Sequence, residues 1–181
     1  MKKDVIIIFI LLMVVPLAVF GQDKVSCPLE TPSARYSPLA GEINHHVFKA
    51  DGEREAIETF FLRSGEKITI GYRGCEYEAL TVRVESSHLA RANGSINAVY
   101  SAASKALSSL ARVRPKNNYA FPMLPAAEAL QREGTKATPA EIGEEISLPG
   151  FGEMSAAVSI RSYQRKKKIG IVVLEMYRGP L

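Results

Sequence analysis

The chain has 181 residues, of which 46% are apolar and 23% charged, and its formal net charge is +4. This length fits one ordinary domain, or at most two very small ones. The composition is that of a folded globular chain, which excludes wholesale disorder and a collagen-like repeat.

The first 21 residues have the pattern of a secretory signal peptide. Two lysines precede an apolar stretch from Val5 to Phe20, and Val19 and Gly21 stand at the −3 and −1 positions of a cut before Gln22. A retained membrane anchor is the alternative, but 16 residues are fewer than the roughly 20 that a spanning helix needs. We therefore expect residues 22–181 to be one exported domain, periplasmic or secreted, with no stable membrane insertion.

The expected export of the chain bears on the state of its two cysteines. In an oxidising compartment, Cys27 and Cys75 are most simply interpreted as one disulfide. It would close a loop of 49 residues and stabilise the fold by roughly 4 kcal/mol on the chain-entropy estimate. Two free thiols, or a catalytic cysteine, are the alternatives, although no histidine lies near either cysteine in the sequence.

Four strand-like segments occupy the first half of the mature chain. Residues 22–42, rich in Pro, Ser and Gly, are expected to form an irregular arm anchored at Cys27. Strands are predicted over 43–49 and 56–62, each followed by a turn signal, and alternating apolar and polar residues predict strands over 67–73 and 79–85. The alternation changes phase between Tyr77 and Leu80, so either a bulge lies near Glu78 or the fourth strand begins at Ala79.

From residue 95 the apolar period changes to three and four residues. This period predicts an amphipathic helix over 95–113, which is the longest helix expected in the chain. Asn93 or Ser95 supplies its N-cap, and Pro115 ends it after Arg114.

A second, shorter helix is predicted between Pro125 and Glu133. Proline is favoured in the first turn of a helix, and Gly134 supplies a C-terminal stop. Thr138 and Glu141 then have the spacing of a capping box, which predicts one further helical turn.

Strands return in the last third of the chain. Segments 154–161 and 169–177 are predicted as strands joined by a polar turn, and a shorter strand over 145–148 is the optional third. Helices grouped between runs of strands indicate an α+β domain, not alternating βαβ units. We expect one antiparallel sheet, in the order ββββ-α-α-ββ, with the helix over 95–113 packed on one face.

Three groups of residues are candidates for chemistry, and each has a simpler structural explanation. Adjacent strand residues point to opposite faces, so His45 and His46 cannot chelate one metal ion in the usual way. The segment Ser86-Ser87-His88 lacks triad geometry and is typical of a polar turn. The pair Glu76 and Glu78 could perform acid–base chemistry, but such residues are more often solvated at a strand start. No motif indicates a metal or a cofactor.

Basic residues gather at the predicted late hairpin. The run Arg165, Lys166, Lys167 and Lys168, with Arg161 upstream, would attract an anionic envelope component or an acidic protein, and nucleic acid is implausible for an exported chain. A solubilising turn is the plainer interpretation. Phe151, between two glycines, is a further candidate for partner contact.

The sequence thus favours a small exported binding module without catalytic activity. An inhibitor or an immunity-type protein acting on an envelope enzyme fits, because such a protein needs only rigid loops on a scaffold. The alternative is a hydrolase of envelope material that uses Glu76, Glu78 or His88 in a cleft between sheet and helices. The sequence patterns do not determine the order of the strands in the sheet or the oligomeric state of the protein.

Overall fold

The computed structural model describes residues 32–37, 41–52, 54–74, 77–92, 94–116, 121–150 and 155–179. The predicted signal peptide, both cysteines of the predicted disulfide, Glu76 and Phe151 lie outside these residues. Predictions that concern them stay predictions.

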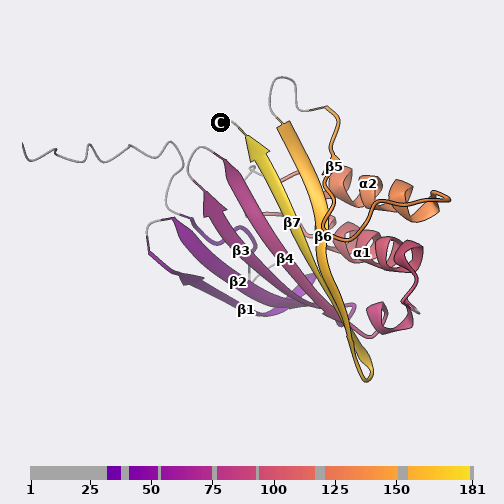
Figure 1. Ribbon diagram of the computed structural model, residues 1–181. Helices are drawn as coiled ribbons and strands as arrows, with labels where there is room; N and C mark the ends of the chain where they lie inside the picture. Colours follow the sequence, from indigo (N-terminus) through magenta and orange to yellow (C-terminus); the bar gives the residue numbers. More distant parts are fainter. Residues whose placement is uncertain are drawn as a thin grey trace, which may run out of the picture.

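One antiparallel sheet of seven strands contains all the described strands (Figure 1). The strands are β1 (Ile43–Ala50), β2 (Glu55–Leu62), β3 (Lys67–Gly74), β4 (Glu78–Ser86), β5 (Ile146–Ser147), β6 (Ser155–Lys166) and β7 (Ile169–Gly179). Their order in the sheet is β1-β2-β3-β4-β7-β6-β5. The α+β class and the antiparallel sheet are therefore confirmed, and the optional late strand exists as the two-residue β5.

Strict alternation along β3 and β4 decides which side chains enter the core. Ile68, Ile70 and Val82 are fully buried, while the residues between them face the other side of the sheet. The register of β3 and β4 is continuous up to the pair Gly74 and Glu78, so no bulge is present there and β4 begins at Glu78. Gly74 has φ +144°, and a Cβ there would meet the carbonyl of Tyr77, so this corner requires glycine.

A helix pair covers one face of the sheet. Helix α1 (Ile96–Ala111) begins at the N-cap Ser95, whose hydroxyl accepts a hydrogen bond from the Ala98 N–H at 3.3 Å. It buries the predicted stripe, including Val99, Leu107 and Leu110, against the sheet. The helix ends at Ala111, two residues before the predicted boundary.

Helix α2 (Met123–Thr135) starts and ends two residues outside the prediction. Gly134 is not its stop but part of its last turn, where a Cβ would come within 3.1 Å of the Asn97 carbonyl oxygen and of the Ser101 nitrogen of α1. The absence of a side chain at Gly134 allows this close approach of the two helices. The Asn97 side chain donates instead to the carbonyls of Gly134 and Lys136 at the end of α2, at 3.2 and 2.8 Å.

The predicted helical turn after Thr138 is wrong. The Glu141 N–H donates to the side chain of Glu144, not to a Thr138 cap, and the Gly143 N–H bonds to the Ile160 carbonyl at 2.8 Å. These bonds hold the segment as a non-helical turn against β6. No helix among the described residues is long and apolar enough to cross a membrane.

Candidate functional site

Residues 32–37, which we name the strap, connect the sheet to the end of α1. Tyr36 pairs with Pro115 in an isolated antiparallel bridge, and the Lys116 N–H donates to the Arg35 carbonyl at 2.5 Å. On the other side, the backbone N–H groups of Arg35 and Tyr36 donate to the side chain of Glu58 in β2. The described part of the predicted irregular arm is thus bonded to both layers of the fold.

Glu58 is fully buried and serves as the acceptor around which the strap is organised. Its two oxygens accept the Arg35 and Tyr36 N–H groups at 3.2 and 3.0 Å, the His46 Nε2 at 2.5 Å and the Tyr72 hydroxyl. Burial and the Glu58 charge hold the pKa of Tyr72 far above its ordinary value. Tyr72 therefore stays a protonated donor at physiological pH, and the Glu58 carboxylate has four donors for its two oxygens.

Glu78 at the start of β4 is buried as well. Its side chain is 3% exposed, which corrects the expectation of a solvated carboxylate. The guanidinium groups of Arg35 and Arg178 bind one oxygen each, Arg178 at 2.8 Å. The Arg35 guanidinium also lies 4.9 Å from the centre of the Tyr72 ring, a cation–π distance.

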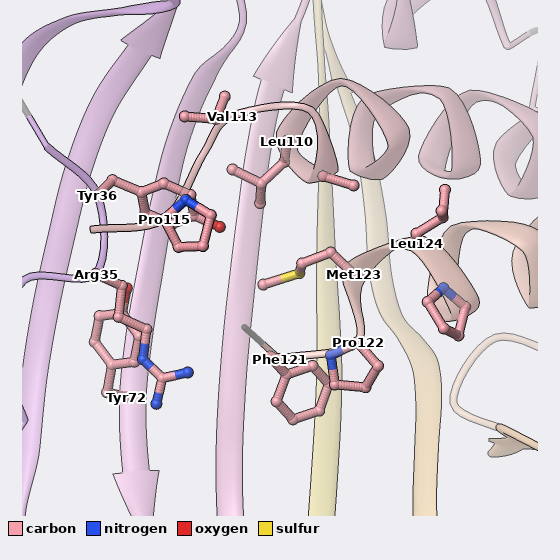
Figure 2. A pocket seen from close by; sticks show the side chains of 12 residues that line it. Arg35, Tyr36, Tyr72, Leu110, Val113, Pro115, Phe121, Pro122, Met123 and Leu124 are labelled. Carbon is pink, nitrogen blue, oxygen red and sulfur yellow. The ribbon is translucent and has the colours of Figure 1, made fainter. Parts of the chain in front are cut away.

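Beside this cluster lies an apolar hollow of about 240 Å³, which we name the strap cavity. Figure 2 shows Arg35 and Tyr72 on one side of it and Phe121, Pro122 and Met123 on the other. The strap, the middle of the sheet and the facing ends of the two helices contribute its twelve lining residues, which are Arg35, Tyr36, Tyr72, Leu110, Ala111, Val113, Pro115, Phe121, Pro122, Met123, Leu124 and Pro125.

The described lining of the strap cavity is suited to binding by shape and apolar contact. Arg35 is its one charged member, and that charge is already paired with Glu78. At roughly 30 Å³ per water molecule, the cavity has space for about eight waters. It is smaller than the roughly 300–1,000 Å³ of ordinary small-molecule pockets, so it fits one large side chain or a short acyl segment.

The predicted basic residues lie elsewhere. Arg165 and Lys166 end β6, and Lys167 and Lys168 form the two-residue turn to β7. The predicted hairpin is confirmed, but β6 continues to Lys166, five residues beyond the predicted strand 154–161. All four are exposed, and none takes part in an ion pair within the described chain. Arg161 lies in the middle of β6, away from the hairpin tip, and its Nε pairs with the Glu175 carboxylate at 2.6 Å.

The histidine pair faces two directions, as the sequence predicted. His46 stacks on the buried Phe60, whereas His45 meets Phe61 edge-on across the other face. A register shift between Asn44 and Val47 accompanies a positive φ of 52° at His45. Among the described residues, no group of three or more His, Cys, Asp or Glu side chains is placed to hold a metal ion.

His88 forms part of a polar turn, which agrees with the structural interpretation of its segment. Its N–H donates to the Ser86 hydroxyl at 3.0 Å, so this oxygen caps a turn. His88 lines a groove that shares no lining residue with the strap cavity, and Glu78 does not line this groove. The predicted hydrolase residues are therefore not brought together within the described chain.

Sequence reasoning missed Arg35, Tyr36, Glu58 and Tyr72. One signal was available, because Glu58 shares its strand phase with the apolar Ala56 and Phe60 and so points into the core. The partners of Glu58 come from separate segments, and no local pattern connects them. No family model, curated protein or solved structure matches the chain.

Proposed function

We propose that this protein is a small exported binding module without catalytic activity, which receives an apolar group of a partner in the strap cavity. The partner is a protein with an exposed aromatic or branched aliphatic side chain. An inhibitory or immunity-type role on an envelope enzyme is the setting that fits such a module. The observation that carries the proposal is an apolar hollow with a single, already paired charge in its described lining.

The state of the two buried carboxylates supports binding over hydrolysis. A general acid or base must reach the proton that it transfers, and it needs an oxygen free for that contact. Both Glu58 oxygens accept hydrogen bonds from the protein, and both Glu78 oxygens are bound by arginines. These groups are engaged in holding the strap.

The size and position of the cavity support a protein partner. Interface energy is concentrated in a few aromatic or aliphatic anchors that fill pockets. The exposed Leu124, 55% accessible, borders the cavity and extends its apolar surface outward. A side chain inserted beside Leu124 would be surrounded by apolar residues of the two helix ends.

Indole is a suitable probe because it has the size of one large side chain. We expect a saturable titration in amide NMR spectra, with shifts concentrated at the strap and at the facing helix ends. Replacing Ala111 by Leu fills the cavity and should weaken indole binding at least tenfold without loss of thermal stability.

The matched control is Ala102→Leu, on the same helix but away from the strap cavity, which should leave indole binding unchanged. The proposal is wrong if indole causes no saturable shifts, or if the two alanine variants weaken binding equally.

A further inference from the structure

A second hollow lies between the start of β3 and α1, at the opposite end of the covered sheet face from the strap cavity. Its volume is about 490 Å³, and we name it the Glu66 groove. Glu66 and Tyr72 belong to one extended segment and are six residues apart, roughly 20 Å by strand rise, whereas Ser109 of the groove and Leu110 of the strap cavity are neighbours on α1. The two sites share no lining residue.

Glu66 distinguishes this groove from an ordinary surface hollow. Its side chain lines the groove and is only 7% exposed, yet its Oε2 atom has no hydrogen-bond partner among the described residues. The other buried glutamates of the sheet, Glu58 and Glu78, have both oxygens engaged. A buried polar atom without a partner costs free energy, so Glu66 is destabilising unless something else supplies a donor.

The rim of the groove has the opposite charge. Arg91 and Lys105 are exposed and line the groove, and His88 lies beside them. Free cations are repelled by this rim, and simple anions are repelled by Glu66. A molecule with an ammonium group at one end and a carboxylate at the other satisfies both.

The walls leave space for a chain to lie along α1. Small side chains, including Ala98 and Ala102, face the groove, so a ligand backbone can approach the helix closely. The volume is within the ordinary range of small-molecule sites. The last torsion of a glutamate side chain is soft, which lets the unpartnered oxygen turn toward a ligand.

We propose that the Glu66 groove binds a small zwitterion, an amino acid or a short peptide. Its ammonium group donates to Glu66, and its carboxylate lies between Arg91 and Lys105. This site is separate from the strap cavity and does not depend on the function proposed there.

The probe is the dipeptide L-alanyl-L-alanine, titrated into the purified protein and followed by amide NMR shifts. Binding should be saturable, with shifts around Glu66, Ser86 and Ala102. N-acetylated dialanine lacks the ammonium group and dialanine amide lacks the carboxylate, so each should bind at least tenfold more weakly. Equal binding of the three compounds, or no saturable shift, would overturn the proposal.

Variants separate a ligand site from a structural role of Glu66. Glu66→Gln should weaken dialanine binding at least tenfold while the melting temperature stays unchanged or rises, because an unsatisfied carboxylate is removed. Ala102→Leu should block the groove, and Ala111→Leu should leave dialanine binding unchanged. A lower melting temperature for Glu66→Gln, with unaltered dialanine binding, would show a structural residue and contradict the proposal.

Discussion

Three glutamates point into the covered face of the sheet, and their surroundings differ. Glu58 has four donors and Glu78 has two arginines, whereas one oxygen of Glu66 has no partner among the described residues. Burying a carboxylate is costly unless hydrogen bonds and opposite charges compensate it. The first two therefore stabilise the strap, whereas the unpartnered oxygen of Glu66 lowers the stability of the fold.

Replacing Glu58 by Gln should destabilise the protein strongly. The amide keeps the shape of the side chain but turns one acceptor into a donor, which then faces donors of the strap or of Tyr72. We expect the free energy of unfolding to fall by about 2–3 kcal/mol in urea titrations.

The control for this prediction lies on the same strand. Glu55 pairs with Arg73 at the surface, where ion pairs contribute little, so Glu55→Gln should change the unfolding free energy by less than about 1 kcal/mol. Similar losses for the two variants would contradict the structural role assigned to Glu58.

The inward orientation of two of these glutamates could be predicted from the sequence. The phase of Glu58 and Glu78 along their strands matches the buried apolar residues, so inward orientation was available from alternation alone. Their partners were not available, because Arg35 and Arg178 approach Glu78 from positions 43 and 100 residues away. Such contacts follow from the tertiary fold, and a local pattern cannot show them.

At the scale of elements, the contact of α1 with α2 depends on Gly134. Alanine is favoured over glycine in a helix by roughly 1 kcal/mol, but the added Cβ would press on backbone atoms of α1. Because α1 is packed against the sheet, it cannot move away freely. We expect Gly134→Ala to lower the unfolding free energy by about 1–2 kcal/mol.

The exposed Gln131 of the same helix provides the comparison for Gly134. Gln131→Ala should leave the unfolding free energy within about 0.5 kcal/mol of the wild type. A stability gain for Gly134→Ala in thermal or urea unfolding would contradict this prediction. It would mean that the two helices separate easily and that the higher helix propensity of alanine outweighs the contact of its Cβ with α1.

Glu133, near the end of α2, makes the stability of the fold depend on pH. The Lys136 ammonium and the Ala140 N–H, which donate to its carboxylate, hold the pKa of this buried side chain below its ordinary value of 4.5. A carboxyl group with a lowered folded pKa stabilises the fold above its unfolded pKa, and this contribution is lost as the pH falls through the folded pKa.

Glu133→Gln should therefore lower the unfolding free energy by about 1–2 kcal/mol at neutral pH. The difference from the wild type should shrink below pH 4.5 and vanish in strong acid. Urea titrations across this range test the prediction, with Glu128→Gln on the exposed face of α2 as a pH-independent reference. A difference that persists unchanged in acid would show that the charge of Glu133 is not its source.

For the whole molecule, the central step of the fold is the pairing of β7 with β4. In Figure 1, β7 lies between β4 and β6, although more than 80 residues and both helices separate it from β4 along the chain. Alternation predicted strands such as β3 and β4, where one face is buried, and a nearly continuous apolar run predicted β7, which buries consecutive residues. The strand order did not follow, because the apolar pattern marks which residues of a strand are buried and not which strands pair.

The basic hairpin tip between β6 and β7 shares no residue with the lining of the strap cavity. Four exposed cations stand at the tip beside Ile169, which is 46% exposed. We expect the protein to bind vesicles containing phosphatidylglycerol more strongly than vesicles of phosphatidylcholine alone, with a marked loss at high salt.

Changing Lys166, Lys167 and Lys168 together to Gln should weaken retention on the anionic vesicles by on the order of 100-fold, at about 1 kcal/mol for each lysine near the surface. The matched control replaces the same number of charges off the tip, with Gln at Arg63, Arg73 and Arg83. If the attraction came from overall net charge, both triple variants would lose retention equally. A selective loss for the tip variant places the contact at the hairpin, because local charges near a membrane dominate within a Debye length.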